Sequence, residues 1–368
     1  MNNTVFSRFC DIISAANNCE EIFCYKTPYG NEKLYLCDED YVIVTRTLRG
    51  FLHLFNKIPY KFSGNVHIPS EFLQIVPPRR NISVLSDKLG TAVLAVSPLI
   101  APRYDFASID GKKNPIFAEL KRTDSLSFRK ENNIFILEEE RLIKRAVDDG
   151  TDIKYIVYTP KSQLLANGTI EAAKEKRIQC FLATEGLLSS VTQTRPVPKE
   201  MAMCTLPDFL LEQVSIDHSG VILIADNVEN PDNLGLVIRT ADACGADAVI
   251  SVGNTSIYNK NCVRASRGAV GRFPIAEYSV DEFADIAKKL KSLGYKIYGT
   301  SAKTNTSVHD LANSGGRVFS VSNETNGISK HMADAADEML RIPMATGQSS
   351  LNVAVAAGII LSQAIIFD

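Results

Sequence analysis

The chain has 368 residues, of which 45% are hydrophobic and 22% are charged, and its formal net charge is −2. This length allows two or three domains, and the composition is that of an ordinary soluble globular protein. The near-neutral charge excludes binding of nucleic acid through overall charge alone, although a local basic face is sufficient to hold phosphates.

The N-terminus lacks the features of a targeting segment. No basic stretch precedes an apolar core there, and acidic residues occur early, at Asp11, Glu20 and Glu21. We therefore expect neither a signal peptide nor a transit peptide, and a cytoplasmic location.

Eight cysteines are scattered along the chain without a CxxC pair, and four of them fall in the first 37 residues: Cys10, Cys19, Cys24 and Cys37. This usage suits a reducing compartment. We expect buried or free thiols rather than a zinc site, and no metal.

Residues 1–110 are expected to form a small α+β accessory domain. The segments at 32–38, 40–46 and 91–99 are rich in β-branched and aromatic residues, as strands are. No function follows from this part of the sequence.

Residues 111–205 alternate between helical and strand patterns. A basic amphipathic stretch at 114–133 precedes a strand at 133–139 and a helix at 139–150 that Gly150 ends. Further strands and a helix follow, which predicts a small α/β domain, and 196–207 is expected to be a linker. The basic residues of this domain, including Lys121, Arg122 and Arg129, form either a solvated charged face or a surface that contacts RNA.

Residues 216–368 repeat a strand, a loop and a helix. The apolar strand 221–226 is followed by a loop rich in Asn, Asp and Pro, and a helix that Gly245 ends comes next. Repeated β-loop-α units predict a parallel sheet covered on both faces, with ligands bound beyond the carboxyl ends of the strands.

The chain ends in an apolar helix that Ser350 is expected to begin. Between Leu351 and Phe367 the only polar side chains are Asn352, Ser362 and Gln363. A helix this apolar has no face for water, so we expect it to be buried or shared with a second copy of the chain. Its polar interruptions make it a poor membrane span.

Three loops that follow strands carry unusual polar residues. They are 230–235, 322–327 and 342–352, and no G-x-G-x-x-G fingerprint accompanies them. Between the first two loops, residues 255–276 hold Lys260, Arg264, Arg267 and Arg272 without any acid. Such a run is suited to phosphate binding.

Four segments of the C-terminal part of the sequence resemble a known protein family. DNVENPDNLGLVIRTADACGADAVI, VRASRGAVGRFPI, VFSVSNETNGIS and IPMATGQSSLNVAVAAGIILSQAI stand in the order and spacing of the SpoU (TrmH-type) branch of the SPOUT RNA methyltransferases. Residues 111–205 are similar, more weakly, to the ribosomal-protein-like domain that binds substrate RNA in many members. The resemblance implies a C-terminal trefoil knot, a homodimer formed through the last helix, and transfer of methyl from S-adenosylmethionine to a ribose 2′-hydroxyl of ribosomal RNA or tRNA. The domain at 111–205 favours a structured RNA such as ribosomal RNA over tRNA.

The resemblance also implies roles for individual residues. The catalytic set would be Asn233, Arg239, Glu324, Ser350 and Asn352, and Arg239 would anchor a phosphate and stabilise the developing alkoxide, because an arginine is too basic to act as a simple base. The cofactor set would be Thr300, Ser322, Asn323, Gly327, Ile342, Met344 and Leu351. RNA would be bound by Lys121, Arg122, Arg129, Arg264 and Arg267.

Two positions depart from the family pattern. Ser322 and Glu139 stand where the family usually has glycine, and a side chain at position 322 would bear on cofactor binding. The alternative function is therefore a non-catalytic RNA-binding or ribosome-assembly factor that retains the fold.

Overall fold

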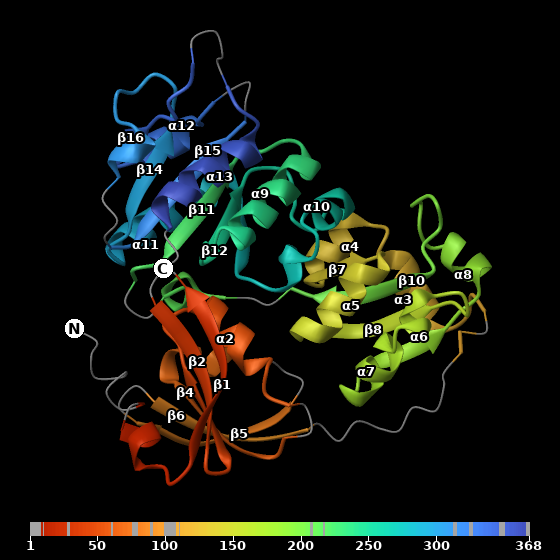
Figure 1. Ribbon diagram of the computed structural model, residues 1–368. Coiled ribbons are helices and arrows are strands. Elements are labelled where there is room, and N and C mark those ends of the chain that lie inside the picture. The colour runs from red at the N-terminus through yellow and green to blue at the C-terminus, as the bar shows by residue number, and fades with distance from the viewer. Residues whose placement is uncertain are drawn as a thin grey trace.

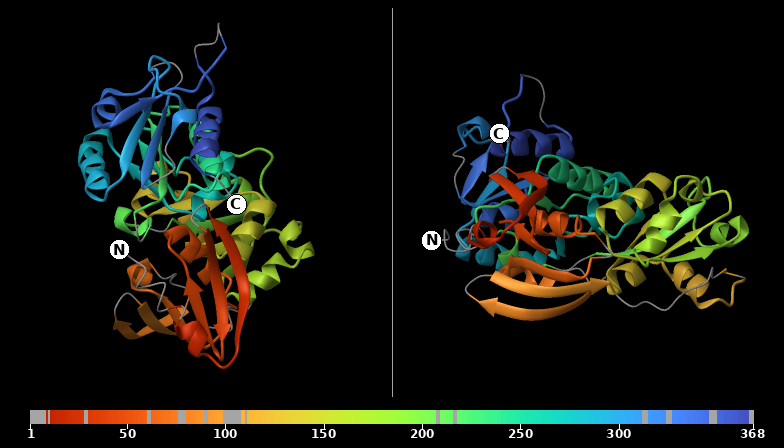
Figure 2. Two further views of the ribbon diagram at one scale, coloured as in Figure 1. Left: turned by 60° about the vertical axis from the view of Figure 1, so that its left-hand side comes forward. Right: turned by 60° about the horizontal axis from the view of Figure 1, so that its bottom comes forward.

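The computed structural model builds the chain around three β-sheets, each forming a separate region (Figure 1, with further views in Figure 2). The structure describes residues 9, 11–27, 30–59, 62–75, 80–88, 91–98, 108–109, 111–206, 209–215, 218–311, 315–323, 327–345 and 350–365. Within these ranges, no helix is both long and apolar enough to cross a membrane.

The N-terminal region is a six-stranded sheet in the order β1-β2-β3-β4-β6-β5. Its strands are β1 (Cys19–Thr27), β2 (Gly30–Cys37), β3 (Asp40–Val44), β4 (Gly64–Pro69), β5 (Arg80–Lys88) and β6 (Thr91–Pro98), with a 3-10 turn η1 (Ser70–Ile75). All neighbours are antiparallel except β3 and β4. Helix α2 (Leu48–Phe55) buries its apolar face in the core of this sheet, and β2, β3 and β6 overlap the three strands expected from the sequence.

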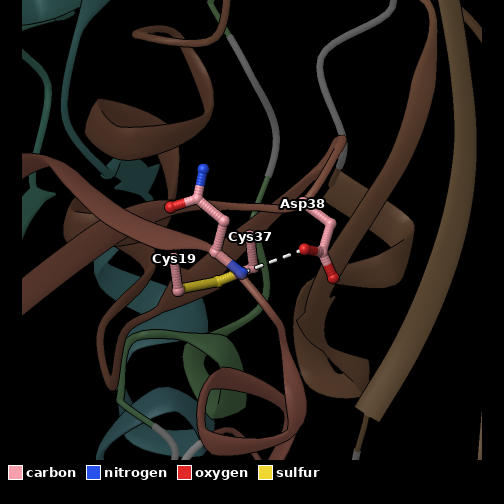
Figure 3. The surroundings of a disulfide bond; sticks show 4 residues. Cys19, Cys37 and Asp38 are labelled. Carbon is pink, nitrogen blue, oxygen red and sulfur yellow. Dashed lines mark hydrogen bonds between the residues drawn. A yellow bond between two sulfur atoms is a disulfide. The ribbon is translucent and has the colours of Figure 1, made fainter.

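A disulfide joins the first two strands (Figure 3). Cys19 and Cys37 are register partners in the β1–β2 pair, with their Cα atoms 4.0 Å apart. The expectation of free thiols is therefore wrong for these two residues, because antiparallel pairing places their side chains opposite each other. Next to the bridge, the backbone N–H of Asn18 donates to the carboxylate of Asp38 at 3.1 Å.

The middle region is a four-stranded sheet in the order β7-β10-β8-β9, made of β7 (Ile134–Leu137), β8 (Ile153–Tyr158), β9 (Gln179–Leu182) and β10 (Glu200–Thr205). Its helices are α3 (Pro115–Arg122), α4 (Leu126–Glu131), α5 (Glu140–Asp149), α6 (Gln163–Ala166), α7 (Thr169–Glu175) and α8 (Glu185–Ser189). The stretch at 114–133 forms two helices rather than one, because the Ser125 side chain caps α4.

Strand β10 corrects the expectation of a linker at 196–207. It lies between β7 and β8, and Met201, Ala202, Met203 and Cys204 are fully buried. These residue types have little strand preference of their own, so burial between two partner strands decides the conformation.

The C-terminal region is a six-stranded parallel sheet in the order β13-β12-β11-β15-β14-β16, as predicted. Its strands are β11 (Val221–Asp226), β12 (Ala248–Val252), β13 (Ile275–Tyr278), β14 (Lys296–Thr300), β15 (Arg317–Ser322) and β16 (Glu338–Leu340). Helices α9 (Pro231–Ala243), α10 (Lys260–Ala265) and α13 (Val353–Ala364) pack into one hydrophobic core, and α11 (Val280–Ser292) and α12 (Lys330–Ala335) pack into another. Three 3-10 turns precede strands β11, β13 and β15 along the chain: η2 (Leu211–Gln213), η3 (Ala269–Gly271) and η4 (Val308–Asp310).

Two helix starts differ from expectation. Helix α9 begins at Pro231, because the side chain of Asn230 accepts a hydrogen bond from the backbone N–H of Asp232 at 2.8 Å and proline suits the first helical position. Helix α13 begins after Asn352 rather than Ser350, because the Asn352 side chain accepts from the N–H of Ala354 at 3.0 Å. The cap of each helix is therefore an asparagine.

The three regions are joined differently. The middle and C-terminal regions share one hydrophobic core, in which Phe135 and Leu142 belong to the same cluster as Phe273 and Leu234. The N-terminal region has a core of its own and docks through polar contacts. The guanidinium of Arg49 in α2 donates to the carbonyls of Ala246 (2.8 Å) and Asp242 (2.6 Å) and to the Asp242 carboxylate (3.0 Å).

Candidate functional site

The starts of α9 and α13 meet. The side-chain amide of Asn352 donates to the side-chain oxygen of Asn233 at 3.2 Å, across 119 positions of sequence. Both helices start beyond strand ends and pack against each other, so the first and third loops predicted from the sequence lie together. Ser350 is exposed just before this contact.

The expected cofactor residues lie at the carboxyl edge of the parallel sheet. Thr300 is the last residue of β14 and pairs with Leu340 of β16, and Ile342 and Met344 follow that strand directly. Ser322 ends β15 opposite Asp226 of β11. The parallel register brings these strand ends to one edge.

The second loop turns sharply after β15. The N–H of Gly327 donates to the carbonyl of Asn323 at 2.9 Å, and Gly327 has a φ of 66°, a left-handed conformation that glycine adopts without strain. Leu351 is half-buried beside the start of α13. Glu324 lies outside the described residues, so its predicted role stays a prediction.

Asp226 is a polar residue at this edge that the sequence motifs did not single out. It is 2% exposed, and its carboxylate accepts a hydrogen bond from the backbone N–H of Ser329 at 2.8 Å. Burial raises the pKa of Asp226 above its ordinary value, against the lowering effect of that hydrogen bond. The carboxylate fixes the loop that follows Gly327, and the signal for it was the single acid at the end of an apolar strand.

Arg239 lies on α9, six residues beyond Asn233, which corresponds to a rise of about 9 Å along the helix. It is exposed, and among the described residues no hydrogen bond or ion pair holds it. The carboxylate of Asp242, on the same helix, is occupied by Arg49 and Arg272. Its guanidinium is therefore available to an anion.

The chain resembles known proteins in both sequence and fold. Residues 220–362 match the model of the SpoU rRNA Methylase family. A TrmH family protein of Staphylococcus aureus (strain MSSA476) is 30% identical over 236 residues, which cover 62% of this chain and 86% of the relative. The chain belongs to the SpoU methylase family.

Other relatives agree with this assignment. The 23S rRNA (guanosine(2553)-2′-O)-methyltransferase RlmP of Bacillus subtilis (strain 168) is 29% identical over 254 residues, which cover 69% of this chain and 97% of RlmP. An AdoMet-bound rRNA methyltransferase from Sinorhizobium meliloti has a TM-score of 0.60 at 26% identity, covering 70% of this chain and 97% of that one. The SpoU methyltransferase AviRb from Streptomyces viridochromogenes, in complex with AdoMet, has a TM-score of 0.60 at 25% identity, covering 68% and 97%.

The expected RNA contacts of this SpoU methylase divide into exposed and buried cations. Lys121 and Arg122 are exposed at the end of α3, and the Arg122 guanidinium stacks over the Phe128 ring at 4.1 Å. Arg264 is 60% exposed and pairs with Asp232 at 3.2 Å, and Arg267 is 41% exposed and pairs with Glu139 at 2.6 Å. These exposed cations stay candidates for RNA binding.

Arg129 requires a correction. It is 4% exposed and donates to the backbone carbonyls of Tyr258 (2.9 Å), Asp124 (3.1 Å) and Thr123. RNA cannot reach a guanidinium that is buried between two regions, so Arg129 positions the middle region against the C-terminal one. Tyr258, whose carbonyl accepts one of these bonds, is also buried.

Proposed function

We propose that this protein transfers a methyl group from S-adenosylmethionine to a ribose 2′-hydroxyl of ribosomal RNA. The observation that carries the proposal is the Asn352–Asn233 hydrogen bond, which joins the first and third motifs of a SpoU family chain. The relative RlmP is named for 2′-O-methylation of 23S rRNA, which favours ribosomal RNA over tRNA as the substrate.

The loops beyond β14, β15 and β16 suit the nucleoside part of the donor. Among the described residues, the backbone N–H groups of Ile342, Met344 and Leu351 make no hydrogen bond to another backbone group. Backbone donors left free beside half-buried apolar side chains fit an adenine and its ribose. Ser322, Asn323, Thr300 and Gly327 would complete the walls.

The chemistry then depends on positioning. When bound, S-adenosylmethionine supplies a methyl group on a positively charged sulfur. The ribose 2′-oxygen would form the new O–C bond as the C–S bond breaks, the sulfur would keep that electron pair as a neutral thioether, and the hydroxyl proton would pass to solvent water. Asn233 and Asn352 orient the reacting groups, and the unpaired guanidinium of Arg239 holds a neighbouring phosphate and stabilises charge that develops on the oxygen.

Each part of the chain has a role in this proposal. Residues 216–368 form the catalytic domain, with the C-terminal segment knotted as a trefoil, and 111–205 form an RNA-binding domain behind the accessory domain 1–110. Leu236 and Val355, which are 36% and 51% exposed on the packed helices α9 and α13, support a homodimer through this face. Sedimentation equilibrium tests the dimer, and a monomer would contradict it. An experimental chain trace tests the knot. Cell fractionation tests the cytoplasmic location that an rRNA substrate favours.

The central test is Arg239→Ala. We expect methyl transfer from labelled S-adenosylmethionine to 23S rRNA to be abolished, while calorimetry still detects binding of the donor, because Arg239 faces RNA rather than the strand-end loops. Unchanged turnover would refute its role. Wild-type protein that fails to bind the donor at millimolar concentration would favour the non-catalytic alternative.

A further inference from the structure

A large recess lies where the three regions meet, away from the strand-end loops. Its volume is about 640 Å³, and its walls come from α2 of the N-terminal region, α5 and the following loop of the middle region, and α9 and η3 of the C-terminal region. Figure 1 shows α2 on the side of the N-terminal sheet that faces the other two regions.

The recess has an excess of positive charge. Six arginines line it, against three aspartates: Arg49, Arg141, Arg145, Arg239, Arg267 and Arg272 against Asp149, Asp152 and Asp242. His53, on the α2 wall, adds no charge at neutral pH, because burial lowers its pKa to about 4. The positive potential therefore comes from guanidinium groups, whose fork geometry matches phosphate oxygens.

The deeper arginines are held in place by the protein itself. Arg49 and Arg272 share the carboxylate of Asp242, and all three side chains are at most 16% exposed. One terminal nitrogen of Arg272, Nη1, is buried without a hydrogen bond among the described residues, and it forms an ion pair with Asp149 at 3.6 Å. The base of the recess thus retains an unsatisfied donor.

The outer arginines are accessible. Arg141 and Arg239 are exposed, and within the described part of the chain neither has an ion-pair partner. Arg145 and Arg267 are 52% and 41% exposed in pairs with Asp149 and Glu139. Exposed pairs of this kind are weak, so a phosphate can replace the carboxylate at little cost.

Close packing fixes the walls relative to one another. A Cβ atom added to Gly150 would lie 2.5 Å from the Asn56 side chain of α2, and one added to Gly271 would lie 2.5 Å from the Phe135 ring. Backbone therefore touches side chain at both seams between regions. The arginines are held at set separations, as binding of a chain of phosphates requires.

We propose that this recess binds backbone phosphates of the substrate RNA next to the methylated nucleotide, and that the N-terminal region contributes its third wall through α2. The inference rests on the proposed function, and it assigns a substrate-positioning role to a region in which the sequence indicated none. Arg239 connects the two sites, because it lines the recess and follows Asn233 on the same helix.

The experiment uses the full chain and a fluorescent 23S rRNA fragment that spans the equivalent of guanosine 2553, the nucleotide in the name of RlmP. Arg141→Gln combined with Arg145→Gln removes two outer charges. Lys288→Gln combined with Lys291→Gln removes two charges from α11, whose side chains pack in the other core, and serves as the matched control. Anisotropy over a salt series measures affinity, calorimetry measures donor binding, and thermal melting checks the fold.

We expect the recess variant to bind RNA at least about tenfold more weakly, with donor binding and melting temperature unchanged. The slope of log affinity against log salt should fall by about 1.4 to 1.8, the value for two lost phosphate contacts, and the control should retain the wild-type slope. If both double variants weakened RNA binding equally, the loss would come from net charge rather than from the recess, and the proposal would be overturned.

The α2 wall has its own test. Asn56→Asp replaces the side-chain amide with a carboxylate of nearly the same shape and places a negative charge in the recess, so RNA affinity should fall a few-fold. In a separate measurement, guanosine monophosphate, a probe for a simple nucleotide site, should compete poorly with RNA for the wild-type protein. Unchanged RNA affinity in Asn56→Asp would remove the N-terminal region from the site. If Arg141→Gln combined with Arg145→Gln kept wild-type RNA affinity while Arg239→Ala lost methylation, RNA binding in the recess would be refuted and the proposed function would stand.

Discussion

The C-terminal and N-terminal regions use their polar residues in opposite ways. In the C-terminal region the strands are apolar and buried, and Asn233, Arg239 and Asn352 are accessible on loops and helices beyond them. In the N-terminal region, Glu32 is directed into the interior and Arg49 is directed against the C-terminal region. One region presents the groups that we propose to be reactive, and the other provides a surface beside them.

This difference explains why the two regions respond differently to substitution. Removing an accessible polar group from a strand-end loop affects binding or turnover, whereas removing a buried one affects the folded state. The three predictions below separate these effects, beginning with the largest.

Asp242→Asn should have the largest effect on stability. The substitution leaves two mostly buried arginines, Arg49 and Arg272, without their shared carboxylate, which should lower the free energy of unfolding by about 3 kcal/mol. Urea denaturation measures the change. Asp285→Asn, in an exposed pair with Lys288, is the matched control and should have little effect. Equal stability of the two variants would mean that the N-terminal region does not depend on this contact.

The stability of the N-terminal region should fall as pH rises. Glu32 is 4% exposed, and burial raises its pKa to about 7 from an ordinary 4.5, against hydrogen bonds from the N–H groups of Arg46 and Thr47. Between these two values the folded state holds a proton that the unfolded chain releases. The stabilisation is therefore complete below pH 4.5 and is lost as pH rises through 7.

The expected loss between pH 5 and pH 8 is about 2 to 3 kcal/mol. Denaturation of wild type and Glu32→Gln across this window measures it, and the glutamine variant should lack this component of the pH dependence. Parallel curves for the two proteins would show that Glu32 titrates normally.

Asn352 should show the smallest change in stability and a clear change in turnover. Asn352→Ala loses the cap of α13, worth about 1 kcal/mol, and Asn352→Asp keeps a capping oxygen. Both lose the amide that donates to Asn233, so methyl transfer should fall by about 10- to 100-fold in both. Full activity in Asn352→Asp would reduce the residue to a helix cap.

The sequence was sufficient for elements whose conformation is decided locally. The run at 221–226 is apolar throughout and became β11, and Gly150 ended α5 with a φ of 75°. The contact between Asn233 and Asn352 was expected from family resemblance, because no periodicity relates residues 119 positions apart.

Features that depend on tertiary packing were missed or misjudged. Arg129 has the same charge as its exposed neighbours, and only its burial against Tyr258 reveals a structural role. Arg49 and Asp242 are 193 positions apart and follow no motif, so their contact leaves no local signal. Strand β10 was missed because its buried Met and Ala residues are weak strand formers.

The continuous core between the middle and C-terminal regions holds these two regions in a fixed arrangement. Phe135 and Phe273 lie in one apolar cluster, and an interface of this kind resists hinge motion. In the proposed function, the distance between the exposed cations of the middle region and the methyl donor is therefore constant. Under this proposal, only an RNA fold that spans this distance would deliver a ribose to the reacting centre, and the shape of the RNA would select the nucleotide.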